Sequence, residues 1–199
     1  MTQTFEHKIN FKGLARRGAK KSHFRQVIPL AATEKNKQNK NIKKMKNLVG
    51  IDKNKAKQLI ENLNQLLADY EIFYQNLRGL HWNIKGKEFF ELHTKFEELY
   101  DDAFIKIDEI AERVLTLEGE PLHTYTDYLK ISSIKEEKSV TNGVKGVEII
   151  VENFSTIITL ERKILDLAGE ANDEGTVSLM SDYITQTEKT LWMLNSYLQ

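Results

Sequence analysis

The sequence contains no cysteine, and this absence excludes two kinds of chemistry. Neither disulfide bonds nor thiolate metal sites can form, so any metal must be held by oxygen and nitrogen ligands. No apolar run approaches the roughly 18 residues that suggest a membrane span, and no membrane partner is expected. The apolar segment Val27–Ala32 is interrupted by Pro29 and is shorter than a secretory signal core of about 7 to 15 residues. These absences favour a cytoplasmic protein.

Several catalytic motifs are missing as well. The chain has no glycine-rich phosphate loop, no paired-histidine motif of a zinc protease, and no nucleophile with a base at a readable spacing. Hydrolase and nucleotide-binding functions therefore have no support in the sequence.

The formal net charge is zero, but the charge is unevenly distributed. Residues 1–44 hold 12 Lys or Arg and two Glu, a net charge of +10, so residues 45–199 hold 17 Lys or Arg and 27 Asp or Glu, a net charge of −10. We therefore divide the chain into a basic N-terminal extension, 1–44, and a folded domain, 45–199. The extension has few large apolar residues and no amphipathic period, which predicts disorder.

The role of the extension stays open at this point. It can be a solvated tail, an addition from an upstream start codon before a natural beginning at Met45, or an organellar presequence. It can also be a DNA-binding arm, since flexible cations neutralise phosphates without reading the base sequence. In that case the protein would be associated with the nucleoid.

Residues 45–199 predict an all-α fold of four long helices. The first begins after the N-cap Asp52 and runs to about Trp82, and the second spans Phe89 to Leu117. Apolar residues of the first helix recur in steps of four and three, which is typical of a bundle helix. The positions are Ala56, Ile60, Leu63, Leu67, Tyr70, Tyr74, Leu77 and His81.

The connection Gly119–Thr141 is long and carries a short helix at about Thr126–Lys130. A segment of this length can span a bundle from end to end, so the third helix is expected to run parallel to the second, as in the crossover of ferritin-like bundles. The third helix is expected to end near Gly169. A fourth follows, capped by Asp173 or Thr176.

Four candidate metal ligands share one face of the second helix. At about 100° per residue, Glu97, Asp108 and Glu112 lie at about 40°, 60° and 100° from His93. Such ligands suit iron, manganese or zinc. His93 and Asp108 are about 22 Å apart along the helix, so one helix cannot close the site. Antiparallel helices in a two-fold dimer would bring His93 of one chain beside Asp108 and Glu112 of the other, which predicts an intersubunit site.

These residues resemble the ferroxidase motif of the Dps miniferritins, a family named for DNA-binding proteins from starved cells. The motif is a histidine followed by tryptophan, a histidine 12 residues on, and an aspartate and a glutamate four apart. Here it reads His81-Trp82, His93, Asp108 and Glu112, with Glu97 where the family usually has a further acid. The resemblance covers about residues 45–199, including the ending EKTLWML.

The resemblance implies a ferroxidase that stores iron and protects DNA. Two Fe(II) ions would bind at each site between subunits and be oxidised by hydrogen peroxide, or less readily by dioxygen, and ferric mineral would collect in a hollow dodecamer built from two-fold dimers. The site residues would be His81, His93, Asp108 and Glu112. Glu97 could be a further metal ligand that bridges the ions, or it could only form a salt bridge nearby.

The resemblance also suggests roles for three other residues. Trp82 would form an aromatic wall of the site. Acids near the start of the last helix would line an entry pore, with Asp173 and Asp182 as candidates.

Glu120-Pro-Leu-His123 matches a di-iron motif superficially, but Gly119 and Pro121 place it in a loop.

Two other functions remain open. The protein could compact DNA through its basic tail, with a structural metal site. It could also be a catalase-like manganese or dimetal enzyme that consumes peroxide without storing mineral.

Overall fold

The computed structural model describes Lys35 and residues 45–199, so the predicted basic extension lies outside the described residues except for Lys35. The described part is all-α, with four long helices and one short helix, as the sequence predicts. The helices are α2 (Lys53–Asn83), α3 (Phe89–Thr116), α4 (Tyr125–Ile131), α5 (Gly143–Ala171) and α6 (Glu174–Tyr197). None of them is long and apolar enough to cross a membrane.

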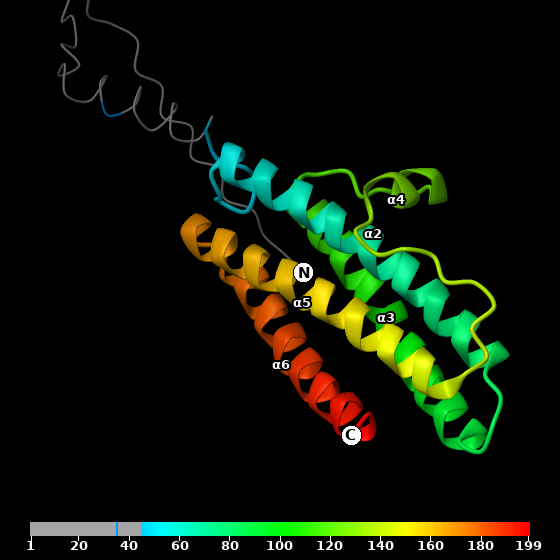
Figure 1. Cartoon of the computed structure of the whole chain (residues 1–199). Helices are drawn as coiled ribbons and strands as arrows, with labels where there is room; N and C mark the ends of the chain where they lie inside the picture. Colours follow the sequence, from blue (N-terminus) through cyan, green and yellow to red (C-terminus); the bar gives the residue numbers. More distant parts are fainter. Residues whose placement is uncertain (1–34, 36–44) are drawn as a thin grey trace, which may run out of the picture. The chain divides into compact units, whose positions relative to one another are not determined.

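Figure 1 shows the bundle topology. Helices α2 and α3 are antiparallel neighbours joined by a tight turn, and α5 and α6 form a second antiparallel pair. The crossover that contains α4 runs along α2 from one end of the bundle to the other, so α5 is parallel to α3. This is the predicted ferritin-like arrangement.

Polar side chains cap the starts of the helices where the sequence predicts them. Asp52 accepts hydrogen bonds from the backbone N–H groups of Asn54 and Lys55 at 2.9 and 3.2 Å. Asp173 caps α6 by accepting from the N–H of Thr176 at 3.1 Å. Each cap satisfies donors that have no partner inside the helix.

The end of α5 differs slightly from its prediction. The helix continues past Gly169 to Ala171, and Asn172 ends it in the left-handed conformation with φ of 54°. Asparagine tolerates this conformation better than most residues, so it takes the terminating role expected of the glycine.

The crossover is anchored by a row of polar side chains on α2. Asn64 accepts from the N–H of Leu122 at 2.9 Å, and Asn76 accepts from the N–H of Glu137 at 2.9 Å. Between them, Asp69 accepts from the N–H of Ser133 at 2.6 Å. These bonds satisfy backbone groups of a long irregular segment that lies against the bundle.

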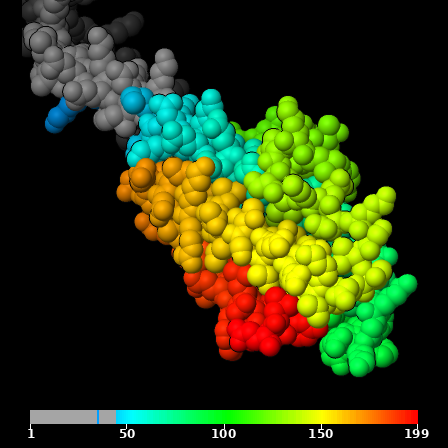
Figure 2. All heavy atoms as spheres, in the orientation of Figure 1, coloured from blue at the N-terminus to red at the C-terminus, as the bar shows by residue number. Residues whose placement is uncertain are grey.

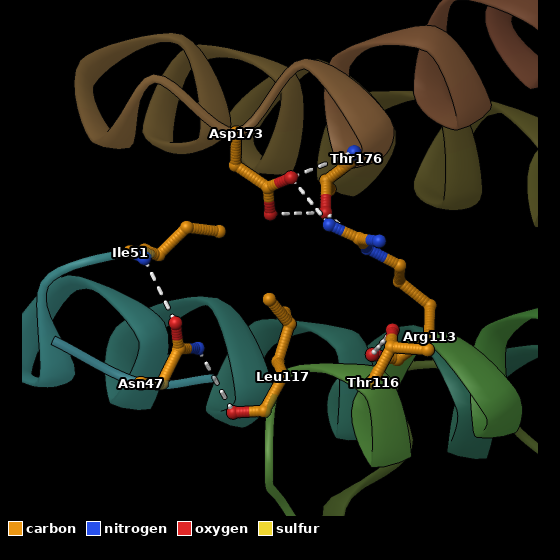
Figure 3. Close-up of polar contacts among 7 residues, drawn as sticks. All are labelled: Asn47, Ile51, Arg113, Thr116, Leu117, Asp173 and Thr176. Carbon is orange, nitrogen blue, oxygen red and sulfur yellow. Dashed lines mark hydrogen bonds and ion pairs between the residues drawn. The ribbon is translucent and has the colours of Figure 1, made fainter. Parts of the chain in front are cut away.

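Arg113 connects α3 to the start of α6 (Figure 3). Its guanidinium forms an ion pair with the buried Asp173 and donates to the Thr176 hydroxyl at 2.8 Å. In the same region Asn47 fastens the segment before α2, because its side chain accepts from the N–H of Ile51 and donates to the carbonyl of Leu117.

Replacing Arg113 with alanine is expected to lower the free energy of unfolding by about 3 kcal/mol, because it leaves the buried Asp173 carboxylate without its cation. Urea unfolding followed by circular dichroism at fixed protein concentration measures this loss. The matched control is Arg162→Ala, which breaks the exposed pair with Glu188 and should cost less than about 1 kcal/mol. Equal losses in the two variants would contradict this interpretation of the Arg113 pair.

Glu161 is a fully buried acid in the middle of α5. Its Oε1 accepts from the hydroxyl of Tyr70 at 2.8 Å, while its Oε2 has no hydrogen-bond partner among the described residues. Burial raises the pKa of Glu161 from 4.5 to about 7, even though Tyr70 and Lys106 oppose the shift. The folded chain therefore holds this proton more tightly than the unfolded chain.

The raised pKa predicts that Glu161 makes the protein less stable as pH rises from about 4.5 to 7. Glu161→Gln keeps an acceptor for Tyr70 and removes the ionisation. We expect the variant to be more stable than the wild type by up to about 3 kcal/mol at pH 8 and to differ little at pH 4.5. Melting temperatures across this pH range test it, and parallel profiles for the two proteins would be the contrary result.

Candidate metal centre

Two histidines meet where α2 leads into α3. His81 lies in the last turn of α2 and His93 near the start of α3, and their rings stack with centroids 3.7 Å apart. Each ring is hydrogen-bonded to the other residue's backbone. Nδ1 of His81 lies 2.8 Å from the carbonyl oxygen of His93, and Nδ1 of His93 lies 2.9 Å from the carbonyl oxygen of His81.

This reciprocal pairing determines which ring nitrogen is available. A carbonyl oxygen can only accept, so each Nδ1 must carry a proton and donate it. In the neutral rings, both Nε2 atoms therefore keep a free lone pair. Fixing the tautomer through a backbone carbonyl is how proteins commonly prepare histidine for metal binding.

The carbonyl of His81 can accept a hydrogen bond from His93 because it lies in the last turn of α2. The last carbonyls of a helix have no partner within it. Here the N–H of Ile84 bonds to Leu80, and the N–H of Lys85 bonds to Thr141 in the crossover, so the His81 carbonyl is left for His93. The turn between the helices thus sets both the spacing and the orientation of the rings.

Glu97 completes a three-residue group. It lies one turn after His93 on α3, and ligand atoms of His81, His93 and Glu97 all lie within 4.8 Å of one another. Two imidazole nitrogens and one carboxylate oxygen suit iron, manganese or zinc. Within the described part of the chain, no other group of three His, Asp or Glu side chains has this arrangement.

Tyr100 is a site residue that the sequence analysis missed. Its hydroxyl donates to Glu97 at 3.3 Å, and its ring meets the His81 ring edge-on at 5.3 Å between centroids. Desolvation and then the charge of Glu97 raise the pKa of Tyr100, so the phenol remains protonated. The sequence feature that could have identified Tyr100 was its position three residues after Glu97 and seven after His93, which places it near both on α3.

Asp108 and Glu112 are not part of this group. Both are exposed on α3, and Asp108 is about 22 Å from His93 along the helix. One chain therefore presents a histidine half-site, formed by His81, His93 and Glu97, and a separate acidic pair. That two subunits bring the half-site of one chain beside the acidic pair of the other remains a prediction.

The face of α3 that carries these carboxylates is also apolar. Phe90, Phe104 and Leu115 are 78%, 61% and 57% exposed, and by helical period they lie on the same face as Glu97 and Asp108. Large apolar side chains grouped on one exposed face mark an interaction surface. We call this the α3 face.

The other candidates occupy different surroundings. Trp82 is exposed, with the Arg78 guanidinium 4.8 Å from the centre of its ring, and its place as a wall of the site remains a prediction. Asp173 is buried as the cap of α6, whereas Asp182 is exposed on that helix. A role in lining an entry pore remains a prediction for both residues, and the exposed carboxylate of Asp182 suits this role better than the buried one of Asp173. His123 lies in the crossover, as the sequence indicates.

Comparisons with known proteins agree with this geometry. Residues 60–199 match the ferritin-like domain model. The DNA protection during starvation protein of Porphyromonas gingivalis is 41% identical over 156 residues, which cover 78% of this chain and 98% of that protein. A crystal structure of a Dps protein from Vibrio cholerae O1, described as a member of a broad superfamily of ferritin-like diiron-carboxylate proteins, has a TM-score of 0.77 and 52% identity. That match covers 78% of this chain and 98% of the Vibrio chain.

Proposed function

Because this chain belongs to the Dps family of ferritin-like proteins, we propose that it oxidises Fe(II) at sites shared by two subunits and stores the ferric product inside a dodecameric cage. The observation that carries the proposal is the half-site of His81, His93 and Glu97, with both Nε2 atoms free for metal. Iron is the substrate and cargo of these sites.

The α3 face supplies the other half. Its exposed apolar residues favour burial against a second copy, and a two-fold axis would oppose two antiparallel α3 helices. Asp108 and Glu112 of the partner subunit would then lie beside His93. Each dimer would hold two such sites, and each site would take two iron ions.

The ligands divide the chemistry between them. The neutral imidazoles of His81 and His93 bind Fe(II) without adding charge, and the carboxylates of Asp108 and Glu112 favour the more highly charged Fe(III). Glu97 would be a further ligand, kept in place by the Tyr100 hydroxyl. With hydrogen peroxide as oxidant, two Fe(II) each give one electron, the O–O bond breaks, and two protons are taken up to form two waters. Paired iron thus avoids releasing a hydroxyl radical.

The uneven charge favours an additional role in binding DNA. Residues 1–44 carry a net charge of +10, which suits contact with phosphates, while the net charge of −10 on residues 45–199 suits the attraction of cations. The proposed location is the cytoplasm, at the nucleoid when DNA is bound. If the tail alone supplies the function, iron oxidation would be dispensable for protection of DNA.

The proposed function is tested by loading the protein with Fe(II) without oxygen and then adding hydrogen peroxide. Near-ultraviolet absorbance follows ferric oxide, and particle mass is recorded alongside. We expect fast formation of soluble mineral by a large oligomer. Iron that precipitates as it does in buffer would contradict ferroxidation, and peroxide turnover without mineral would favour a catalase-like enzyme.

A further inference from the structure

The start of α5 is attached to the turn between the two histidines. The carbonyl of Thr141 accepts from the N–H of Lys85, in the turn that joins α2 to α3, at 2.8 Å. The next residue, Asn142, caps α5 by accepting from the N–H of Lys145 at 2.9 Å. Figure 2 shows the start of α5, in yellow, adjoining this turn, in green. The first turn of α5 is therefore placed to influence the geometry of the half-site.

Each ligand of the histidine half-site directly follows a buried apolar residue. For His81, His93 and Glu97 in turn, these residues are Leu80, Leu92 and Phe96. We call them the three apolar neighbours. Adjacent residues of a helix point about 100° apart, so each apolar neighbour enters the core while the ligand beside it lies on another side of the helix. Because the two share a backbone, displacing an apolar neighbour also displaces its ligand.

Two glycines of α5 make room for these apolar side chains. A Cβ atom at Gly143 would lie 2.5 Å from Cδ1 of Leu92. One turn further on, a Cβ atom at Gly146 would lie 3.3 Å from Cδ2 of Leu80 and 3.4 Å from Cζ of Phe96. These distances are shorter than the roughly 3.5 to 4.0 Å at which carbon atoms pack. A side chain at either glycine would therefore have to displace an apolar neighbour.

The local structure of α5 gives no other reason for glycine at these positions. Glycine is less favourable in a helix than every residue except proline, and alanine is the most favourable. Neither Gly143 nor Gly146 has a positive φ, so the helical backbone does not require glycine at either place. The space that the apolar neighbours occupy is what requires it.

We infer that Gly143 and Gly146 are positioning residues for the iron half-site, a role that rests on the proposed function. The two glycines let the three apolar neighbours pack close to the backbone of α5. This contact sets how closely the adjoining ends of α2 and α3 approach α5, and with it the stacking of the two rings and their exchange of hydrogen bonds. A close-packed core transmits displacements, and a metal-binding group must be held within about 0.5 Å of its productive geometry.

Gly146→Val places further carbon atoms against two fully buried side chains, so these side chains must move. Binding is measured by titrating the full chain with Co²⁺ in the absence of oxidant and following the visible absorption of the bound ion. The part of the signal that His93→Ala abolishes belongs to the half-site. We expect Gly146→Val to weaken Co²⁺ binding there about 10-fold. Gly143→Ala should weaken it less, because only the end of the Leu92 side chain has to move.

The two histidine rings provide a second readout that needs no metal. Nitrogen solid-state nuclear magnetic resonance of histidine-labelled protein should show Nδ1 protonated in both His81 and His93 of the wild type. In Gly146→Val a fraction of the other tautomer should appear, because the exchange of hydrogen bonds is disturbed. A wild type that binds no Co²⁺ would count against the proposed function, whereas unchanged tautomers in the variant would count against the positioning role.

Leu92→Val provides a rescue for Gly143→Ala. Among the described residues of other segments, only Leu92 lies within 4 Å of the added Cβ atom. Valine removes one carbon atom from Leu92 while alanine adds one at Gly143, and volume-conserving exchanges of this kind are the best tolerated in a core. The double variant should therefore regain the Co²⁺ affinity of the wild type. A double variant that binds as weakly as Gly143→Ala would exclude the contact with Leu92 as the route.

Two control variants lie further along α5. Gly169→Ala makes the same substitution where no described atom of another segment lies within 4 Å of the new Cβ, and it should bind Co²⁺ like the wild type. Ile164→Ala removes a fully buried side chain about 27 Å along α5 from Gly146, so it should lower the melting temperature without changing Co²⁺ affinity. Gly146→Val that is folded by circular dichroism and keeps both the wild-type affinity and the wild-type tautomers would overturn the positioning role.

Discussion

Replacing His93 with alanine is expected to lower the rate of peroxide-dependent iron oxidation at least about 100-fold. The substitution removes one of the two Nε2 ligands and the ring that stacks on His81, although the backbone carbonyl of residue 93 that fixes the His81 tautomer remains. Stopped-flow absorbance after anaerobic Fe(II) loading measures the rate. His123→Ala is the matched control, because this exposed histidine lies in the crossover, and it should oxidise iron at the wild-type rate.

The proposed shared site also predicts the result for a second variant. Asp108→Ala should lose activity to a similar extent, although Asp108 is about 22 Å from His93 in its own chain. A wild-type rate in His93→Ala would remove the histidine half-site from the mechanism. Loss in His93→Ala with full activity in Asp108→Ala would place the reaction within one subunit.

Deletion of residues 1–44 is expected to abolish salt-sensitive binding to DNA. The segment carries 12 Lys or Arg and a net charge of +10, while the remaining chain has a net charge of −10 and should repel phosphates. If about six to ten phosphates are neutralised, affinity in the full chain should fall by about 10³ to 10⁵ between 50 and 200 mM salt. Gel-shift titrations at several salt concentrations measure this dependence.

The deletion also separates the two proposed roles. Iron oxidation by the shortened chain should equal that of the full chain, because the half-site and the α3 face lie within residues 81–115. Unchanged DNA binding after the deletion would refute the arm. A deletion that removed both activities would indicate that residues 1–44 support the assembly itself.

Much of the fold could be predicted because its signals are local. Asp52 and Asp173 mark helix starts by a side chain that caps the next few N–H groups, and the apolar period determines which face of each helix is buried. The length of the crossover was enough to predict a parallel third helix. The end of α5 was misplaced by two residues, because Asn172 takes the left-handed conformation that glycine usually provides.

The interactions that the sequence could not predict join residues far apart in the chain. No local pattern indicates that Asp69 holds Ser133 or that Arg113 pairs with Asp173, because both depend on how helices pack. The exchange of hydrogen bonds between His81 and His93 depends on the turn that aligns two helix ends. Sequence spacing predicted the two histidines as ligands, while the assignment of their tautomers required the backbone geometry.

The candidate site was predictable in composition but not in its full geometry. His81, His93 and Glu97 come together within one chain, as their spacing around the α2–α3 turn allows. Asp108 and Glu112 could join this group only from a second copy, so their proposed role rests on the exposed apolar residues of the α3 face. The central claim is therefore that two subunits share each site.

Co-assembly of two inactive variants tests this claim most directly. His93→Ala and Asp108→Ala chains, dissociated and reassembled at equal amounts, would form mixed dimers in which one site keeps an intact histidine half and an intact acidic pair. With random pairing, half of the dimers are mixed and one of their two sites is intact, so shared sites predict recovery of about a quarter of the wild-type iron oxidation. Mixed particles, verified by mass, that stay as inactive as either variant alone would contradict the shared site.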